Sequence, residues 1–324
     1  MSNLDHQKVK EVIKKIFDCN KVSEFISFPS SVNTLLQFEI NNEKYMIKIL
    51  TLPTLSEWEN HRLDKEGKLL DLFFKHDSLK VPVPELVHIE NNDELIGYKF
   101  IIYRFVDGVI LWSIWRDLSK EEQIRLVKEL ASIVKEIHSV KYDWFGEIED
   151  IEEVSRHSSY KESTLNWIQE LKDCISENKS LPMDLLEKAQ KFVQNNIDKV
   201  TYKPVPTLVH NDIHQANVIV KKNEQGNYKI QAIVDWEWAC SANLLDDLFW
   251  IKDMVLTDKE LESAFFLEYF QGERDNLDDF VIDRKISNIC LGLDTAASIW
   301  DTHHPPTDEE VEEVKRSLEE NSKE

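Results

Sequence analysis

The sequence predicts an α+β protein with two lobes, a small β-rich N-terminal lobe and a larger, mainly helical C-terminal lobe. Its 324 residues correspond to roughly two domains at about 150 residues each. A hydrophobic content of 42%, with 9 Trp, 15 Phe and 8 Tyr, is that of a globular chain and not of a disordered one. Short β-prone runs dominate the first part of the chain and helical spacing dominates the second. We place the lobes at 1–105 and 106–324.

Short β-prone runs define the N-terminal lobe. After a helix within the first 20 residues, the runs 34–40 and 44–50 flank an Asn41-Asn42-Glu43 turn and predict a hairpin. A T-x-x-E capping box at 54–57 predicts the start of a helix that reaches residue 74. Two more strands are expected at 86–89 and 99–106.

Two charged residues of this lobe fall on apolar faces. Alternation along the second hairpin strand places Lys48 on the same face as Met46 and Leu50. Glu66 lies on the apolar stripe of the following helix, three residues after Leu63. A carboxylate on such a stripe is costly unless it is paired, so Glu66 requires a cation or donors from the element on which it packs.

Helical spacing governs the C-terminal lobe. A long amphipathic helix is expected over 124–137, ending near His138. An acidic helix over 309–318 is expected to lie at the periphery. Further helical patterns run through 165–175, 185–197 and 245–270.

A polar loop, residues 210–217, lies between two short apolar runs. If 218–220 and 230–234 pair as a hairpin, Asn217 precedes one strand and Asp235 follows its antiparallel partner. Both side chains then lie at one end of the ribbon, and Asp212 belongs to the loop at that end. Oxygen ligands of this kind suit Mg²⁺, which takes one or two carboxylates and completes its shell with water and substrate phosphates.

The spacing of these residues is that of a kinase catalytic loop. Asp212 and Asn217 form D-x-x-x-x-N, in which the Asp accepts a substrate hydroxyl proton and the Asn binds metal, and Asp235 would hold the other metal position. A chance arrangement of loop-capping residues is the alternative. A cluster of His210, Asp212 and His214 could instead ligate a transition metal.

These motifs carry a family resemblance. H-x-D-x-x-x-x-N over 210–217, with Asp235 of V-D-W-E-W-A 18 residues after Asn217, resembles the aminoglycoside phosphotransferase and choline-kinase-like family of small-molecule kinases. Asp246-Asp247-Leu248 resembles the downstream D-L pair of that family, and the upstream elements follow a similar order. The resemblance implies a two-lobed protein-kinase-like fold that transfers a nucleotide γ-phosphoryl group to a small-molecule hydroxyl.

The resemblance also implies roles for individual residues. Asp212 would orient and deprotonate the acceptor hydroxyl, and Asn217 and Asp235 would hold Mg²⁺. Lys48, paired with Glu66, would bind the α- and β-phosphates of ATP or GTP, although a purely structural ion pair is the alternative. Ser30, Ser31 and Asn33 would occupy the phosphate loop, which has no glycine in this sequence.

The remaining implied roles concern the base pocket and the catalytic loop. Arg104 to Val106 would supply hinge backbone groups to the base. The bulky Tyr103 would line the back of the base pocket, which resembles the GTP-preferring members. His210 would brace the loop, and Asp247 would support it or merely cap a helix.

We therefore predict a nucleotide- and Mg²⁺-dependent small-molecule O-phosphotransferase, with the 141–200 helices as substrate region. Acids such as Glu237 and Asp246, together with a formal charge of −22, favour a cationic acceptor, either an aminoglycoside, as in antibiotic resistance, or an amino alcohol. A neutral or zwitterionic acceptor such as a sugar, a macrolide or homoserine is the enzyme-class alternative. A pseudokinase that binds nucleotide without transfer is the non-enzyme alternative.

The charge also bears on partners and location. With 39 Lys and Arg against 61 Asp and Glu, the chain lacks the positive charge that binding to a phosphate backbone requires. No stretch approaches roughly 18 consecutive apolar residues, and no basic segment followed by an apolar one starts the chain. We expect a cytoplasmic protein without nucleic-acid or membrane partners; the oligomeric state is not indicated.

Overall fold

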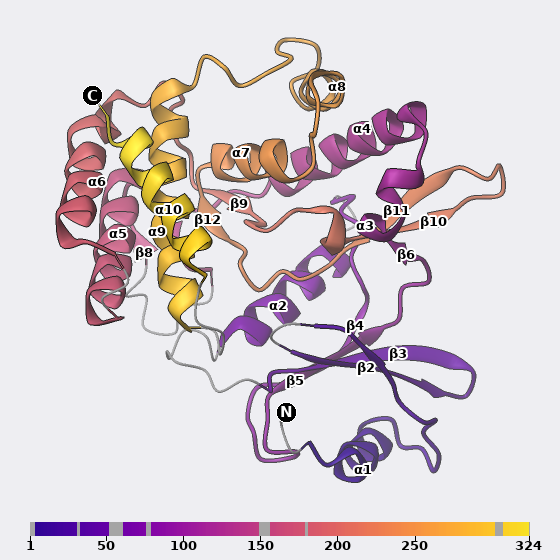
Figure 1. Ribbon diagram of the computed structural model, residues 1–324. Helices are drawn as coiled ribbons and strands as arrows, with labels where there is room; N and C mark the ends of the chain where they lie inside the picture. The colour runs from indigo at the N-terminus through magenta and orange to yellow at the C-terminus, as the bar shows by residue number, and fades with distance from the viewer. Residues whose placement is uncertain are drawn as a thin grey trace. The chain divides into compact units, whose positions relative to one another are not determined.

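The structure, a computed structural model, describes residues 4–30, 33–51, 61–75, 79–148, 156–178, 181–301 and 307–323 (Figure 1). Ser31 and the predicted capping box at 54–57 lie outside the described residues. The chain forms two compact units. The first unit comprises Met1–Ile137 and Asp212–Ala239, and the second unit comprises His138–Asn211 and Cys240–Glu324. The lobe boundary at residue 105 stays a prediction.

An antiparallel sheet with strand order β1-β2-β3-β5-β4 forms the N-terminal part of the first unit. The predicted hairpin is confirmed, because Ile40 pairs with Glu43 across a two-residue turn. Asn41 and Asn42 in this turn have φ of 53° and 66°, the left-handed conformation that a tight hairpin turn needs. The strands are β1 (Ile26–Phe28), β2 (Thr34–Ile40), β3 (Glu43–Ile49), β4 (Leu86–Glu90) and β5 (Phe100–Arg104).

A helix covers each face of this sheet (Figure 1). Helix α1 (His6–Ile16) packs its buried Val9 and Ile13 in one core with Ile47 and Ile49 of β3, as the alternation along that strand predicts. Helix α2 (Arg62–Lys75) contacts β4 and β5 on the other face. The missing Cβ at Gly67 lets α2 approach closely, since a Cβ there would lie 2.5 Å from Ile89 Cδ1.

A second small sheet, with strand order β11-β10-β6, completes the first unit. The predicted hairpin of residues 218–220 and 230–234 is confirmed, because Val218 pairs with Ile233 and the Val234 N–H donates to the Asn217 carbonyl at 3.0 Å. Gly108 precedes β6 where a Cβ would lie 2.6 Å from the Val220 oxygen. The elements are β6 (Val109–Ile110), α3 (Leu111–Ile114), η2 (Trp115–Asp117), α4 (Lys120–Ile137), η4 (Gln215–Asn217), β10 (Val218–Lys222) and β11 (Tyr228–Ile233).

The second unit is mainly helical, with one short sheet of order β8-β7-β12-β9. Its strands are β7 (Phe145–Gly146), β8 (Arg156–His157), β9 (Thr207–Val209) and β12 (Cys240–Ala242). Its helices are α5 (Tyr160–Asn178), α6 (Met183–Asn196), η3 (Ile197–Lys199), α7 (Leu244–Met254), α8 (Lys259–Tyr269), α9 (Val281–Asp301) and α10 (Asp308–Asn321). The helical pattern over 245–270 is two helices, because the chain breaks between α7 and α8 and Asp258 caps α8.

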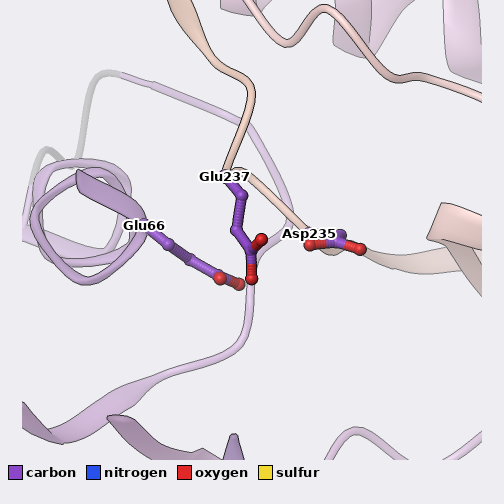
Figure 2. Close-up of side chains that lie close together, drawn as sticks. All are labelled: Glu66, Asp235 and Glu237. Atoms are coloured by element: carbon purple, nitrogen blue, oxygen red, sulfur yellow. The ribbon is translucent and has the colours of Figure 1, made fainter. Parts of the chain in front are cut away.

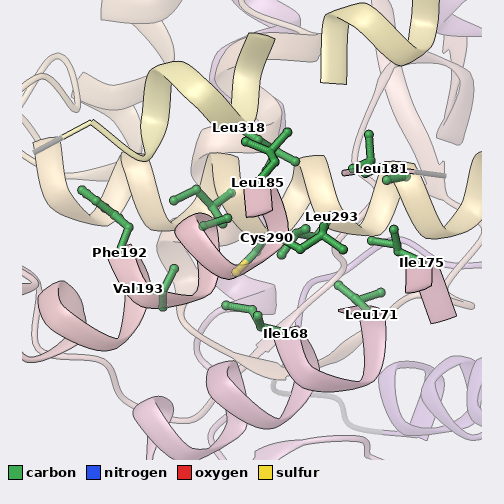
Figure 3. Packing of buried hydrophobic residues seen from close by; sticks show 14 of the residues in the cluster. Ile168, Leu171, Ile175, Leu181, Leu185, Phe192, Val193, Cys290, Leu293 and Leu318 are labelled. Carbon is green, nitrogen blue, oxygen red and sulfur yellow. The ribbon is translucent and has the colours of Figure 1, made fainter. Parts of the chain in front are cut away.

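Helices α5, α6, α9 and α10 enclose a hydrophobic core in the second unit (Figure 3). The acidic C-terminal helix, expected at the periphery, has most of its side chains exposed but buries one face. Leu318 of α10 is fully buried and Val314 is buried one turn before it, so the helix closes this core with one face. No helix in the described part of the chain is long and apolar enough to cross a bilayer.

Candidate active site

A buried lysine stands at the centre of the charged residues of the first unit. Lys48 Nζ donates to Glu66 Oε2 and to Asp235 Oδ1, at 2.7 Å each. It also lies 2.6 Å from Glu237 Oε1. Lys48 therefore has three carboxylate partners. Glu66 reaches this point from α2, and Asp235 and Glu237 reach it from the loop after β11 (Figure 2).

Glu237 joins this cluster to the phosphate-loop segment. Its Oε1, which faces Lys48, also accepts a hydrogen bond from Asn33 Nδ2 at 2.6 Å. Glu237, Lys48 and Asn33 are all buried. The Asn33 N–H in turn lies 3.2 Å from Ser30 Oγ, to which it donates. Glu237, predicted as a substrate acid, is thus placed beside the lysine.

The charges in this cluster shift one another. Burial alone would lower the pKa of Lys48, but Glu237, Glu66 and Asp235 outweigh burial and hold it well above its usual value. Burial raises the pKa of Glu66 to about 7, although Lys48 opposes that shift. Lys48 is therefore a permanent buried cation that faces an excess of carboxylates.

The predicted catalytic loop brings Asp212 and Asn217 into direct contact. Asn217 Nδ2 donates to the Asp212 carbonyl oxygen and to Asp212 Oδ2, at 2.9 Å each. His214 Nε2 lies 3.5 Å from Asp212 Oδ1, and its Nδ1 accepts the Ala216 N–H. Because both hydrogen bonds use the Asn217 nitrogen, its side-chain oxygen is the atom that remains to act as a ligand.

Asp235 is held in an unusual backbone conformation. Its φ is +68°, a left-handed value that Asp adopts more readily than most residues other than glycine. The following Trp236 is fully buried, donates from Nε1 to the Ile233 oxygen at 3.1 Å and packs against Phe73. This anchor fixes the turn from which Asp235 and Glu237 project.

In the second unit, Asp247 braces the chain directly before Asp212. Its two carboxylate oxygens accept the N–H groups of His210 at 2.8 Å and Asn211 at 2.6 Å. His138 Nε2 lies 3.1 Å from the same carboxylate, and His138 Nδ1 lies 2.7 Å from the Tyr269 hydroxyl. Burial would raise the pKa of Asp247, but its contacts with His138 and His210 outweigh burial and lower it.

The predicted hinge residues follow β5. Tyr103 pairs with Met46 in the sheet, and burial followed by Glu66 raises its pKa. The Arg104 N–H already donates to the Glu85 oxygen, and the Phe105 N–H donates to the Lys44 oxygen. Val106 is half-buried at the end of this segment.

Asp246, the other predicted substrate acid, lies in α7 of the second unit. Burial, with neighbouring Asp247, raises its pKa to about 7, although the Asn243 N–H opposes the shift. The same carboxylate raises the pKa values of Tyr160 and Cys290, after the effect of burial on each. Tyr160 lies in α5 and Cys290 in α9.

Asp235 is the member of the carboxylate cluster around Lys48 whose chemistry and exposure fit a divalent cation. One carboxylate oxygen from each of Glu66, Asp235 and Glu237 lies within 4.8 Å of the others (Figure 2). The Asp235 side chain is 42% exposed, so its carboxylate is accessible from outside the cluster. Carboxylate and amide oxygens are the hard ligands that Mg²⁺ prefers.

Comparison with known proteins identifies the family. The model of the phosphotransferase enzyme family, APH, matches residues 33–280. The chain belongs to this family. No curated protein matches the sequence.

Solved structures with the phosphotransferase fold cover nearly the whole chain. A thermostable mutant of aminoglycoside phosphotransferase APH(4)-Ia, in a ternary complex with AMP-PNP and hygromycin B, matches with a TM-score of 0.68 at 14% identity, covering 97% of this chain and 98% of that one. The gentamicin complex of APH(2")-IIa matches with a TM-score of 0.67 at 19% identity, covering 98% and 97%. The predicted two-lobed, protein-kinase-like fold is thereby confirmed.

Membership of the phosphotransferase family makes the chain a small-molecule phosphotransferase. Asn33 opens the matched range, which contains every described residue of the predicted site except Ser30. The sequence prediction had not connected Glu237 to Lys48 and Asn33. The sequence feature that could have indicated this connection is the V-D-W-E run, in which Asp235 and Glu237 flank the apolar Trp236.

Proposed function

We propose that this phosphotransferase moves the γ-phosphoryl group of ATP or GTP to a hydroxyl group of a cationic small molecule. The observation that carries the proposal is the Asn217–Asp212 hydrogen bond in the loop that leads into the strand pair β10–β11, with Asp235 in the loop after β11. The first unit thus contains a candidate base, an amide oxygen, a carboxylate and a buried cation.

In this proposal Asp212 accepts the proton of the acceptor hydroxyl as that oxygen attacks the γ-phosphorus. Asn217 holds Asp212 through two hydrogen bonds, which fixes the carboxylate direction before the acceptor binds. Lys48 contacts the phosphates and remains charged throughout because its pKa is raised.

Asn217 and Asp235 are the residues that would hold Mg²⁺, with Glu237 as a further carboxylate nearby. When bound, the ion neutralises phosphate charge. Asp235 is suited to this role because its carboxylate is the exposed member of the Lys48 cluster.

A cationic acceptor, an aminoglycoside or an amino alcohol, is supported by the formal charge of −22. Of the two acids predicted from sequence to bind it, Glu237 is already engaged by Lys48 and Asn33, so Asp246 is the remaining candidate. The similar structures contain hygromycin B and gentamicin, which favours the aminoglycoside class.

The test is a coupled assay of nucleoside diphosphate release with Mg²⁺. ATP and GTP are each run against aminoglycosides, choline, macrolides, sugars and homoserine. We expect release to be stimulated by a cationic acceptor and to fall about 100-fold or more in Asp212→Asn, with nucleotide binding retained. Asp184→Asn, an exposed acid on α6, is the control and should match the wild type.

Three results would contradict the proposal. Stimulation by a neutral acceptor alone would contradict the cationic class, and full activity of Asp212→Asn would contradict the role of Asp212. Bound nucleotide without any transfer would instead favour a pseudokinase.

A further inference from the structure

A single oxygen atom links the loop that precedes β2 to the buried lysine. Glu237 Oε1 lies 2.6 Å from Lys48 Nζ and accepts from Asn33 Nδ2 at 2.6 Å. Asn33 and Glu237 are 204 positions apart in the sequence, so only the fold brings them together. The contact is built rather than accidental, because the Lys48 and Glu237 side chains are 5% and 4% exposed.

The loop before β2 lacks the residue type that lets a backbone approach a phosphate closely. Residues 29–33 read Pro-Ser-Ser-Val-Asn, without a glycine to let the backbone wrap closely around a phosphate. The described end of this loop is instead held by side chains. The Asn33 N–H bonds to Ser30 Oγ, and the Asn33 amide group bonds to Glu237.

Glu237 is one of three carboxylates that hold Lys48. Glu66 and Asp235 each accept a hydrogen bond from Lys48 at 2.7 Å. The contribution specific to Glu237 is therefore the connection to Asn33. An acceptor shared by two donors fixes the distance between them.

We propose that Glu237 is a positioning residue that ties Asn33 to Lys48, so that the two side chains meet the nucleotide phosphates as one preset pair of donors. This role rests on the proposed function, and it lies in the acceptor oxygen of Glu237 rather than in its charge. Preset donors bind without an ordering cost, which increases affinity for the phosphates.

The variants Glu237→Gln and Glu237→Ala distinguish the effect of the acceptor oxygen of Glu237 from the effect of its negative charge. Both variants lose the same negative charge, but Gln keeps an Oε1 that can accept from Asn33 and Lys48. The readout is the dissociation constant of ADP without metal, in EDTA, which excludes any effect of Glu237 as a metal ligand. We expect ADP to bind about tenfold more tightly to the Gln variant than to the Ala variant, the upper end for one hydrogen bond between neutral groups.

The same pair of substitutions is then made in an Asn33→Ala background. In that background residue 237 has no Asn33 amide to bind, so the difference in ADP affinity between the Gln and Ala variants should shrink to less than about threefold. Glu262→Gln and Glu262→Ala in α8, where a buried Glu faces Lys252 at 2.6 Å, are the matched control and should leave ADP affinity unchanged. Circular dichroism and thermal unfolding verify that each variant is folded.

The positioning role of Glu237 would be wrong if the folded Glu237→Gln and Glu237→Ala variants bound ADP with equal affinity. It would also be wrong if a tenfold difference between them persisted in the Asn33→Ala background. Failure of the wild type to bind nucleotide even with Mg²⁺ would overturn the proposed function, and the positioning role of Glu237 with it. Failure of the positioning role with normal wild-type binding leaves the proposed function intact, so the two are distinguishable.

Discussion

The imidazole of His138 lies 3.1 Å from the carboxylate of Asp247, and both side chains are buried in the second unit. Asp247 in turn accepts the N–H groups of His210 and Asn211, the two residues before Asp212. The carboxylate thus fixes the entry of the chain into the catalytic loop. The Tyr269 hydroxyl, 2.7 Å from His138 Nδ1, fixes the far side of the ring.

Asp247→Ala should lower the free energy of unfolding by about 3 kcal/mol, because the buried His210 N–H and the part-buried Asn211 N–H lose their acceptor. Asp247→Asn keeps one acceptor oxygen and should cost less. Since the pKa of Asp247 is lowered on folding, its stabilisation is present above the unfolded value near 4 and is lost as pH falls through the folded value. Urea unfolding should therefore show the gap between wild type and Asp247→Asn closing from pH 5 to pH 3. A gap that does not depend on pH would contradict this assignment.

Lys48→Met should abolish detectable transfer and also make stability depend more strongly on pH. Without the ammonium group, Glu66 and Glu237 remain buried without their cation, so ionisation of these carboxylates opposes folding. The variant should be clearly less stable at pH 8 than at pH 5.5, by more than the wild type. Thermal unfolding at the two pH values measures this difference, and Lys48→Met/Glu66→Gln should recover part of the loss at pH 8. An unchanged pH dependence would mean that the carboxylates move into solvent.

Asp246→Asn should stabilise the protein at pH 8. The pKa of Asp246 is raised to about 7 on folding, so the unfolded state ionises first and the penalty grows as pH rises from about 4 to about 7. Replacement by Asn removes a penalty of about 1–2 kcal/mol at pH 8 and changes little at pH 4.5. Chemical denaturation at both values provides the measurement. Destabilisation at pH 8 would show that the charged form has a favourable partner.

Leu318→Ala should lower the free energy of unfolding by about 2–4 kcal/mol. Leu318 is fully buried, and its Cδ2 would lie 3.1 Å from a Cβ built on Gly292, so α9 and α10 pack closely. Leu267→Ala on α8 is the matched control, because that side chain is 42% exposed, and it should cost less than about 1 kcal/mol. Equal losses for both variants would argue that α10 contributes little to the core.

Local patterns predicted the parts of the site that depend on neighbouring residues. Period-two alternation put Lys48 on the face opposite Ile47 and Ile49, and the Lys48–Glu66 pair followed from two charges on apolar faces. Antiparallel pairing of β10 and β11 predicted that Asn217 and Asp235 lie at the same end of the hairpin. The roles of these residues in phosphoryl transfer stay predictions.

Contacts between distant segments could not be predicted in this way. Asn33 and Glu237 have no common periodicity, and Glu237 reaches Lys48 only because Trp236 anchors the turn after β11. The acidic composition of α10 concealed its inner face, although Val314 and Leu318 stand four residues apart, at helical spacing. The same spacing in 286–297 could have revealed α9, which was not predicted.

The division of the chain has a consequence for biosynthesis. The segment Asp212–Ala239 belongs to the first unit, but residues 138–211 of the second unit are made before it. The emerging chain therefore cannot pair β10 with β6 until those intervening residues have left the ribosome. The late pairs are Ile219 with Ile110 and Val220 with Val109. Such late, non-local pairing slows folding and leaves apolar surface exposed to solvent for longer. We therefore expect translation speed and chaperones to affect the yield of folded protein.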